Sequence, residues 1–513
     1  MSISRGDVVR SLRKVLAEEA ISTEVEQRSL FGADLAYEGE PPLAVVVPDS
    51  VDLLQKTVAV LAKLGIPFAP RGGGLSYSRG YIVDTKDWVA IDMRCLNRII
   101  EINTQDNYVT VEAGCTWQQL ADALHSSGLR PPFWGPYSGQ DATVGAAVAQ
   151  NAVFYGSGLF GTIAESLLGL SVVLPDGTLM HTGSAASQSA PSSFFRHLGP
   201  DLTGLFIGAC GAFGIHATVT LALRRRPLFT ATRGYRLASA AQVAQMMMQI
   251  GQAGVAAECM TFDPAMMSRA AKSAVLQEWQ PGRRVAADQV FLLSTVHEGM
   301  TAAAAEAAAE TVDGIARTVG AQPDGAGPLA AMRVKPFQSP TTLIGPNGLR
   351  WLPFHAIVPH SRHLDTITAI EDFMTAQAGP LAAEGLSWGF VSMLVGSSAV
   401  LIEPSFYWPD APSAVTRAYL PDQAKAVRWP DRPELRTALL GLRDHLAGIL
   451  TSRGAINIQI GRSYPFSQRI NPANMRLLEA IKWALDPSGL TNPGVLDLAA
   501  PEATADAEGQ DTK

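Results

Sequence analysis

Cysteine is scarce in this sequence, and its distribution excludes two kinds of small-domain architecture. The four cysteines are Cys95, Cys115, Cys210 and Cys259, and no CxxC pair or Cys/His cluster accompanies them. A disulfide framework and a structural zinc site both need closer spacing. We therefore expect buried free thiols, as in a reducing compartment, and a cytoplasmic protein.

Charge and long apolar runs are also limited. Charged residues make up 17% of the chain and the formal net charge is −7, so no nucleic-acid-binding surface is expected. No apolar run reaches the roughly 18 residues that a membrane-spanning helix needs, so we expect no membrane partner. The N-terminal MSISRGDVVRSLRKVLAEEA lacks the continuous apolar segment of a signal peptide and is typical of an amphipathic helix.

What the sequence does have is length and an ordinary hydrophobic share. Its 513 residues, 47% of them hydrophobic, predict two or three globular domains with a large core. No internal repeat is present. The last residues, 499–513, are small and acidic and are predicted to form a disordered tail.

Three consecutive glycines stand in PRGGGLSYSRGY, residues 70–81. Glycine lets a ligand approach the backbone N–H groups closely, so a bound phosphate is one interpretation and a simple turn is the other. A strand is predicted before this segment, in IPFAPR, and strands after it, in VAIDM and NRIIEINTQDNYVTVEAG. Rossmann and Walker loops lead from a strand to a helix, so neither fits this loop.

Helices and strands alternate along the rest of the chain. Ser50 and Gly65 are predicted to cap one helix, and Thr116 begins another. Residues 142–183 are rich in small side chains and end in a hairpin that turns at Asp176-Gly177. From about residue 228 the pattern changes to that of a second domain, without further phosphate-type loops.

Together, these stretches resemble the FAD-linked family that includes vanillyl-alcohol oxidase and p-cresol methylhydroxylase (PCMH). The resemblance is carried, in order, by PRGGGLSYSRG, VTVEAGCTWQQLADAL, ATVGAAVAQNAVFYGSGLFGTIAESLLGLSVVLPDG, DLTGLFIGACGAFGIHATVTL and INPANMRLLEAIKWALDPSGLTNPGV. It covers roughly residues 40–225 and 460–498 well and is thinner between them. It implies an α+β fold with a two-part PCMH-type FAD-binding domain and an α+β cap domain built on an antiparallel sheet.

The domain boundaries follow from the same comparison. We predict an FAD-binding domain at 1–226, with its core at about 40–226, and a substrate or cap domain at 227–460. Residues 461–498 are predicted to return to the FAD-binding domain.

The resemblance also implies which residues hold the cofactor. In the family, the glycine loop binds the diphosphate of FAD through backbone N–H groups, and the backbone near Ile215 would meet the adenine. Tight packing is the alternative role for each small residue. The predicted FAD-lining residues are Arg71, Gly72, Gly73, Gly74, Leu75, Ser76, Tyr77, Pro136, Thr143, Gly145, Ala149, Asn151, Gly156, Gly161 and Ile215.

Some residues depart from the family pattern. Many relatives carry a flavin-linking histidine where this chain has Leu75, and others carry a cysteine where it has GPYSGQD. We therefore expect FAD to be bound non-covalently, with a His or Tyr tether from the cap domain left open. Tyr137 replaces an acidic residue near the flavin ring and is a candidate for hydrogen bonding to substrate or for proton acceptance, although its normal pKa near 10 makes it a poor base.

Two further residues are candidates for contact with substrate. His355, in RWLPFHAIV, would share one strand face with Trp351, and a structural histidine is the alternative. Arg462, in GRSYP, stands where phenol-oxidising relatives hold the substrate phenolate, and a surface arginine is the alternative. No metal site is predicted, because the GHxGDGNxH-like motif of metal-dependent 2-hydroxy-acid dehydrogenases is absent and the histidines in FHAIVPHSRH are not four residues apart on one helix.

The expected activity is FAD-dependent oxidation, in which hydride leaves an activated C–H of a phenol or aryl alcohol for flavin N5. A 2-hydroxy acid or sugar is the alternative substrate, and a flavin-binding subunit without turnover is the alternative function. O2 or a redox protein would accept the electrons. A homodimer is a further expectation, because relatives form dimers.

Overall fold

Helices in this protein begin and end where the local sequence supplies caps. Ser50 accepts a hydrogen bond from the Leu53 N–H at the start of α3 (Val51–Leu64), and Gly65, with φ of 65°, ends the helix. α4 (Trp117–Leu124) begins with a capping box formed by Thr116 and Gln119. Both helices and their caps confirm the sequence prediction.

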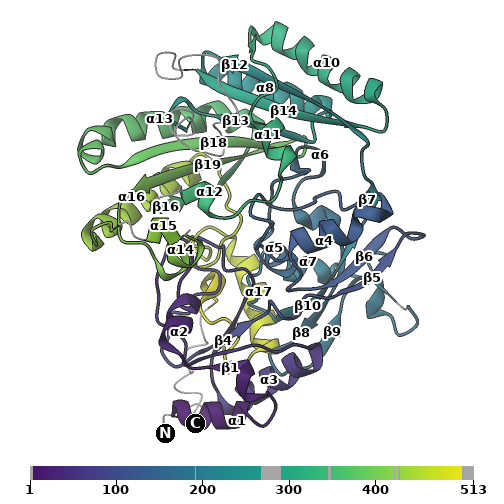
Figure 1. Ribbon diagram of the computed structural model, residues 1–513, viewed down its shortest axis with the longest axis vertical. Helices are drawn as coiled ribbons and strands as arrows, with labels where there is room; N and C mark the ends of the chain where they lie inside the picture. Colours follow the sequence, from purple (N-terminus) through teal and green to yellow (C-terminus); the bar gives the residue numbers. More distant parts are fainter. Residues whose placement is uncertain are drawn as a thin grey trace, which may run out of the picture.

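The computed structural model describes residues 4–190, 192–266, 290–344, 348–420, 422–425 and 428–498. The predicted disordered tail lies outside these residues. Figure 1 shows two lobes along the long axis, one formed by the N-terminal part of the chain and one by the middle part.

The first lobe contains two sheets. β2, β4 and β3 pair in parallel and β1 pairs with β2, whereas the second sheet, in the order β5-β6-β10-β8-β9, is antiparallel. The glycine loop therefore joins two strands of one parallel sheet, β3 and β4, as predicted. The other elements of this lobe, with α3 and α4, are α1 (Arg5–Leu12), β1 (Ile21–Ser22), α2 (Val25–Phe31), β2 (Ala44–Val46), β3 (Phe68–Arg71), β4 (Val89–Asp92), β5 (Ile99–Asn103), β6 (Tyr108–Glu112), β7 (Leu129–Arg130), α5 (Val144–Gln150), α6 (Ser157–Phe160), β8 (Leu167–Val173), β9 (Leu179–His181), α7 (Leu202–Phe206), β10 (Ile215–Ala222) and β11 (Arg224–Arg225).

The second lobe is built on one large antiparallel sheet, which confirms the predicted α+β cap. Its strand order is β15-β12-β14-β13-β18-β19-β16, and β17 also pairs with β19. The elements are β12 (Phe229–Leu237), α8 (Ala240–Ala253), β13 (Glu258–Phe262), β14 (Phe291–Gly299), α10 (Ala302–Val319), β15 (Gln322–Pro323), α11 (Pro328–Val334), α12 (Thr341–Ile344), β16 (Arg350–Pro353), β17 (Ala356–Pro359), α13 (His360–Ala383), β18 (Ser387–Val395), β19 (Ala399–Trp408), α14 (Ala414–Tyr419), α15 (Asp422–Lys425) and α16 (Pro433–Ser452).

The two faces of this sheet bury different cores. One face packs against α8, α10, α13 and α16 and contributes Cys259, Val400 and Ile402 to a large core. The other face contributes Met260, Leu401 and Met393 to a smaller cluster on the side of the first lobe. Because side chains alternate along a strand, neighbours in β19 are divided between the two faces.

The C-terminal part of the chain returns to the first lobe. α17 (Pro472–Leu485) and the turn after it place Met475, Val495 and Leu496 in the core of that lobe. Lys482, buried at the same place, donates to the Ala212 carbonyl at 2.7 Å and pairs with Asp486 at 2.6 Å. Figure 1 shows this segment beside α5 and β10.

Buried charges join the two lobes. Arg333 on α11 pairs with Glu258 and Glu298 of the cap sheet, each at 2.6 Å, and Arg130 on β7 of the first lobe also pairs with Glu298. The Glu258 carboxylate additionally accepts the Gly156 N–H at 2.8 Å. Separating the lobes, or removing one member of this network, would leave uncompensated buried charges. The network therefore holds the two lobes in one relative position.

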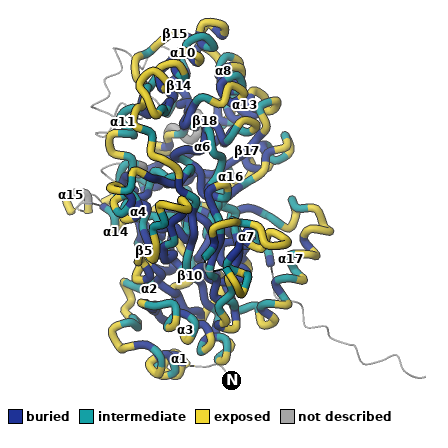
Figure 2. The backbone as a smooth tube through the Cα atoms, turned by 90° about the vertical axis from the view of Figure 1, so that its right-hand side faces the viewer, coloured by how far each residue is buried: buried dark blue, intermediate teal, exposed yellow. Residues whose placement is uncertain are grey.

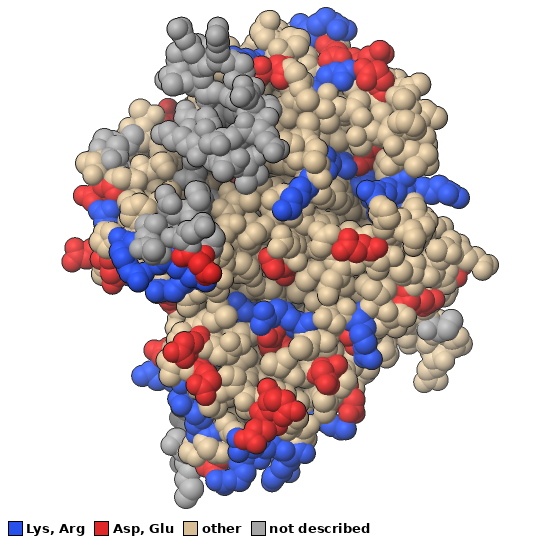
Figure 3. All heavy atoms as spheres, in the orientation of Figure 1, with Lys and Arg blue, Asp and Glu red and all other residues tan. Residues whose placement is uncertain are grey.

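The surface is mixed in charge on the face shown in Figure 3, where acidic and basic side chains are interspersed among uncharged ones. Figure 2 shows buried backbone running through the centre of both lobes. Among the described residues, no helix is both long and apolar enough to cross a membrane. Cys115, Cys210 and Cys259 are buried thiols as predicted, whereas Cys95 is exposed, which corrects the expectation for that residue.

Candidate active site

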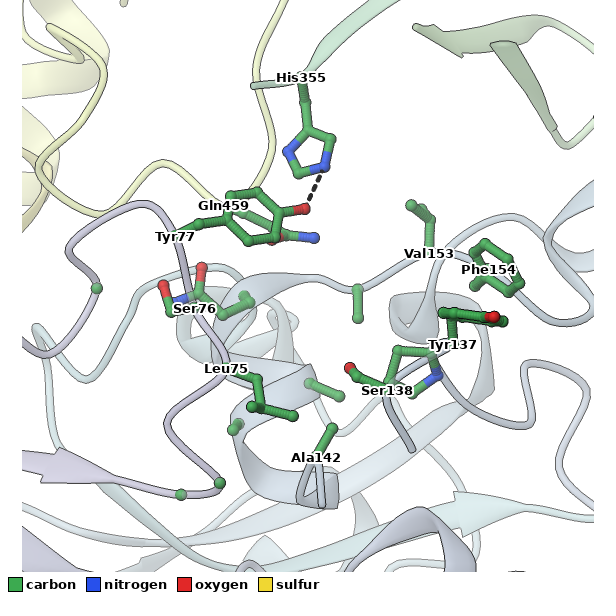
Figure 4. A pocket seen from close by; sticks show the side chains of 18 of the residues that line it. Leu75, Ser76, Tyr77, Tyr137, Ser138, Ala142, Val153, Phe154, His355 and Gln459 are labelled. Atoms are coloured by element: carbon green, nitrogen blue, oxygen red, sulfur yellow. Dashed lines mark hydrogen bonds between the residues drawn. The ribbon is translucent and has the colours of Figure 1, made fainter. Parts of the chain in front are cut away.

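A cavity of about 930 Å³ lies between the two lobes. Its floor consists of the glycine loop, α5 and the start of β10, and its roof is the open face of the cap sheet. Figure 4 shows the arrangement: Leu75, Ser76 and Tyr77 come from the loop below, and His355 points down from the cap. A cavity of this size is at the upper end of the range for cofactor and ligand sites, about 300–1,000 Å³.

The glycine loop carries a run of backbone N–H groups without acceptors in the described part of the chain. No backbone N–H of residues 72–77 has a hydrogen-bond acceptor within the described chain. These residues line the cavity. Buried backbone N–H groups are nearly always paired, and consecutive ones form an anion-binding concavity. The loop therefore fits a diphosphate.

The carbonyl groups of the same loop are bound by Tyr81 within the loop and by three distant segments. They accept hydrogen bonds of 3.0 Å from the Leu35 N–H to Ser76, the Tyr81 hydroxyl to Gly74, the Tyr419 hydroxyl to Gly73 and the Arg462 N–H to Ser78. Asn492 reaches the Gly80 carbonyl at 2.8 Å. With its carbonyls held outward, the loop is pre-organised to present N–H groups inward.

A Cβ at any of the three glycines would collide with a neighbour, at Gly74 with the Arg71 guanidinium. A Cβ at Gly73 would collide with the Asp141 carbonyl, and one at Gly72 would collide with the Thr143 hydroxyl. Gly74 has φ of 75°, a conformation that L residues with side chains rarely adopt. The glycine triplet is thus required by packing against the start of α5 as well as by the approach of a ligand.

Most of the predicted cofactor residues lie in the cavity wall, and direct contact with FAD stays a prediction for each of them. Leu75 is among them, at the position where relatives carry a linking histidine. The predicted residues that line the cavity are Gly72, Gly73, Gly74, Leu75, Ser76, Tyr77, Pro136, Thr143, Gly145, Ala149 and Ile215, with Tyr137 and His355 from the catalytic candidates.

Four predicted cofactor residues do not line the cavity, and contact with FAD stays a prediction for each of them. Arg71 is buried behind the loop, with its guanidinium 4.3 Å from the centre of the Phe31 ring. Asn151, with φ of 50°, caps the C-terminus of α5. Gly156 donates its N–H to the interlobe carboxylate described above, and Gly161, with φ of 71°, ends α6. Their small size or left-handed backbone serves turns and packing.

Arg462 is also outside the cavity wall, and its role as the substrate's anion partner stays a prediction that its observed contacts do not favour. Its guanidinium is buried and donates to the carbonyls of Arg79 and Pro493 at 2.8 and 2.7 Å and to the Asn492 side chain at 2.6 Å. Arg462 therefore fastens the end of the glycine loop to the C-terminal segment.

A polar cluster stands at the roof of the cavity. His355 Nε2 lies 2.7 Å from the Tyr77 hydroxyl and 2.8 Å from Glu403 Oε2, and the tyrosine hydroxyl lies 3.3 Å from the same carboxylate oxygen. Tyr77 comes from the glycine loop, His355 from the break between β16 and β17, and Glu403 from β19. All three residues line the cavity.

His355 is held firmly in this cluster. The predicted strand RWLPFHAIV is interrupted at Phe354 and His355, so it forms two strands, β16 and β17, that both pair with β19. The His355 N–H donates to the Tyr464 hydroxyl at 2.7 Å, and its side chain is 2% exposed. Its Nδ1 is buried and has no partner within the described chain.

Glu403 was missed by the sequence analysis. It is the one acidic residue in AVLIEPSFYW, and Leu401 and Tyr407 share its strand face and line the cavity with it. A single carboxylate within an apolar strand was the available signal, since Glu is almost never buried without a partner.

The two cavity tyrosines are not suited to accept a proton. Burial, followed by the charge of Glu403, raises the pKa of Tyr77 well above its usual value. Burial also raises the pKa of Tyr137. Both side chains therefore act as neutral hydroxyls, and the part of the Tyr137 prediction that assigned it proton acceptance is not supported.

The rest of the cap side of the cavity wall is mostly apolar. Methionine and aromatic side chains dominate its cap side: Met260, Phe262, Met266, Met332, Trp351, Trp388, Met393 and Tyr407. No group of His, Cys, Asp and Glu that could hold a metal ion is found among the described residues.

Comparison with known proteins places this cavity in a family context. Residues 42–183 match the profile of the FAD binding domain family, and that range contains the glycine loop and α5. This match and the solved structures described below support assignment of the chain to the PCMH-type FAD-binding family. The PCMH-type domain accounts for the loop of inward N–H groups, because FAD contains the diphosphate that such a loop fits.

Similarity to characterised proteins supports the same assignment. The chain is 30% identical over 250 residues to the probable mitochondrial D-lactate dehydrogenase of Danio rerio, a match that covers 48% of each chain. The chain spans about half the length of the curated relatives that it matches.

Two solved structures share the whole PCMH-type fold. The structure of p-cresol methylhydroxylase with substrate bound superposes with a TM-score of 0.76 at 16% identity, covering 96% of this chain and 97% of that one. The 4-ethylphenol oxidase of Gulosibacter chungangensis gives 0.75 at 18% identity, covering 98% of both chains.

Substitution of Gly73 by alanine tests the fit of the loop to FAD. Gly73→Ala should lower the flavin content of the purified protein by tenfold or more, because the new Cβ would displace either the loop or the start of α5. Absorbance at 450 nm relative to 280 nm measures this. Gly441→Ala is the control, since nothing lies within 4 Å of a Cβ at that position of α16. Full flavin content in Gly73→Ala would contradict the assignment.

Arg462→Ala distinguishes a structural role from an anion-binding one. We expect lower flavin retention and a lower melting temperature, because three hydrogen bonds to the chain are lost. The KM for whichever substrate the enzyme accepts should change less than threefold in the fraction that retains flavin. A large KM increase confined to anionic substrates would contradict this.

Asp34 makes the stability of the loop region depend on pH. Its carboxylate accepts the Arg79 N–H at 2.9 Å, and burial raises the pKa of Asp34 to about 7 from an ordinary value of 3.8. The folded protein therefore keeps a proton that the unfolded chain releases, so this residue's stabilising contribution is full below about pH 4 and is lost as the pH rises to 7.

Denaturant unfolding at several pH values measures the effect. Asp34→Asn should be less stable than the wild type at pH 5, because an amide N–H would face the Arg79 N–H, and the difference should narrow by pH 7. A difference that widens with pH would overturn the assignment.

Proposed function

We propose that this protein is an FAD-dependent oxidoreductase acting on a small organic molecule, with a phenol or an aryl alcohol as the favoured substrate. The observation that carries the proposal is the row of N–H groups without acceptors on the glycine loop, in the wall of a cavity that the cap sheet covers. When bound, the isoalloxazine of FAD supplies the two-electron acceptor.

The chain's own residues supply binding and orientation. Gly72 to Tyr77 would hold the diphosphate through their N–H groups, and Gly145 and Ala149 on α5 leave room for a flat ring system. Apolar cap residues such as Met260 and Trp388 exclude water and surround a hydrophobic substrate. The Tyr77–His355–Glu403 cluster offers polar side chains to a substrate hydroxyl at the roof of the cavity.

A 2-hydroxy acid is the second candidate substrate. The similarity to the D-lactate dehydrogenase of Danio rerio favours it, because that relative's name describes oxidation of such an acid. The electrons would pass to O2 or to a redox protein in either case.

Anaerobic bleaching tests the activity. The purified protein should show a flavin spectrum, and its absorbance near 450 nm should disappear with a member of a panel of aryl alcohols, para-alkylphenols, 2-hydroxy acids and sugars. A yellow protein that no panel member bleaches would support a flavin-binding subunit without turnover. A colourless protein that FAD does not reconstitute would rule out the proposal.

The same preparation tests how the cofactor is held. Leu75 has no group that can form a covalent link to the flavin, so acid precipitation should release FAD into the supernatant. Yellow colour that stays with the precipitate would show a covalent link and would direct attention to a cap residue.

A further inference from the structure

We infer that Glu403 is the catalytic proton acceptor for the hydroxyl group of the substrate, and that the same carboxylate excludes substrates that carry a carboxylate. This inference rests on the proposed function and narrows its substrate class. It assigns His355 as the positioning residue and Tyr77 as the hydrogen-bond donor of the cluster.

The sign of the charge in the cavity is the first observation. Among the described residues that line the cavity there is no lysine or arginine, and Glu403 is the single acidic residue. Arg462, the cation expected from the sequence, is turned into the protein as described above. A carboxylate ligand would therefore meet a like charge in a largely apolar cavity, where Coulomb interactions are stronger than in water.

The geometry of the cluster is the second observation. Glu403 Oε2 is within hydrogen-bond distance of both His355 Nε2 and the Tyr77 hydroxyl. Its side chain is 21% exposed, against 2% for His355. The carboxylate is thus more open than its histidine partner, and Tyr77 is also partly exposed.

The burial of Tyr77 indicates that this residue does not accept the proton of the substrate hydroxyl. Tyr77 retains its proton, because burial and the neighbouring carboxylate both disfavour the phenolate. It can therefore donate a hydrogen bond to a substrate oxygen but cannot take a proton from it. Glu403 is left to receive the proton, with His355 Nε2 fixing the orientation of the carboxylate.

The chemical step at this cluster is a proton transfer. The O–H bond of the substrate breaks, the proton goes to the Glu403 carboxylate, and the electron pair stays on the substrate oxygen. Loss of hydride from the carbon that bears the hydroxyl in an aryl alcohol, or from the benzylic carbon para to it in an alkylphenol, makes that hydroxyl much more acidic, so a base at this position is needed during oxidation. Tyr77 then stabilises the negative charge on the substrate oxygen by donating a hydrogen bond from its hydroxyl group.

Binding of matched ligand pairs to the flavin-loaded protein tests the exclusion of anions. Calorimetric titration at pH 7.5 would compare 4-ethylphenol with 4-ethylbenzoate and benzyl alcohol with benzoate. In the wild type the hydroxyl ligand of each pair should bind at least tenfold more tightly. In Glu403→Gln this ratio should fall below threefold, chiefly because the carboxylate ligands bind better.

A matched control distinguishes the effect of a charge inside the cavity from the effect of the protein's net charge. Glu310→Gln removes the same charge from an exposed position on α10, outside the cavity, and should leave the wild-type ratio unchanged. Equal binding of both ligand types to the wild type, or a ratio that Glu403→Gln leaves intact, would overturn the inference.

The rate of flavin reduction tests proton acceptance. With the best hydroxyl substrate, the rate should fall about 100-fold in Glu403→Gln, while the flavin spectrum and content stay unchanged. A rate within threefold of the wild type would overturn the catalytic assignment.

His355→Gln distinguishes a positioning residue from a structural one. It should lower the rate of flavin reduction but retain the discrimination against carboxylate ligands, since Glu403 remains. Loss of that discrimination would contradict the assigned roles. Absence of flavin from the wild type would refute the proposed function itself, whereas a flavoprotein that binds both ligand types equally refutes only this inference.

Discussion

The structure depends on the orientation of one short loop. Between Gly72 and Tyr77 no backbone N–H has an acceptor in the described chain, whereas the carbonyls of Gly73 and Ser76 are bound by groups from far along the chain. The C=O and N–H of one peptide unit point in opposite directions, so a peptide whose C=O is hydrogen-bonded on one side directs its N–H to the other side. The loop is therefore an anion site only because the N-terminal segment, the cap lobe and the C-terminal segment hold it from outside.

The cap sheet places Glu403 in the cavity through the alternation of side chains along a strand. Side chains alternate along β19, so Val400 and Ile402 enter the helix-covered core while Leu401 and Glu403 face the cavity. A shift of one residue in register would bury the carboxylate under α13 and α16. The pairing of β19 with β18 and with both halves of the broken strand, β16 and β17, prevents such a shift.

The junction between the lobes contains buried charged side chains, whose desolvation costs free energy, and closely packed backbone. Glu258, Glu298, Arg130 and Arg333 are buried together, and the desolvation of each is offset by the others. Gly158 allows α6 to approach the cap, since a Cβ there would meet the Ala256 and Ala257 carbonyls. The distance between the glycine loop and the cap sheet, and with it the height of the cavity, is fixed by this junction.

Local structure was determined by the sequence itself. The caps at Ser50, Gly65 and Thr116, the strand-to-strand glycine loop and the alternation that marks strands could be read directly, because each depends on residues within a few positions of one another. The FAD-binding assignment followed from five such segments in order, and His355 was selected by its place in a cap strand.

The partners of the side chains were decided by the tertiary structure alone. The sequence offered Arg462 as the residue that would meet the substrate, but three oxygens from other segments take up its guanidinium. It gave no reason to join Tyr77 with Glu403, which are 326 residues apart in the chain and 3.3 Å apart in space. A hydrogen bond is set by distance and direction between folded segments, and neither is a property of local sequence.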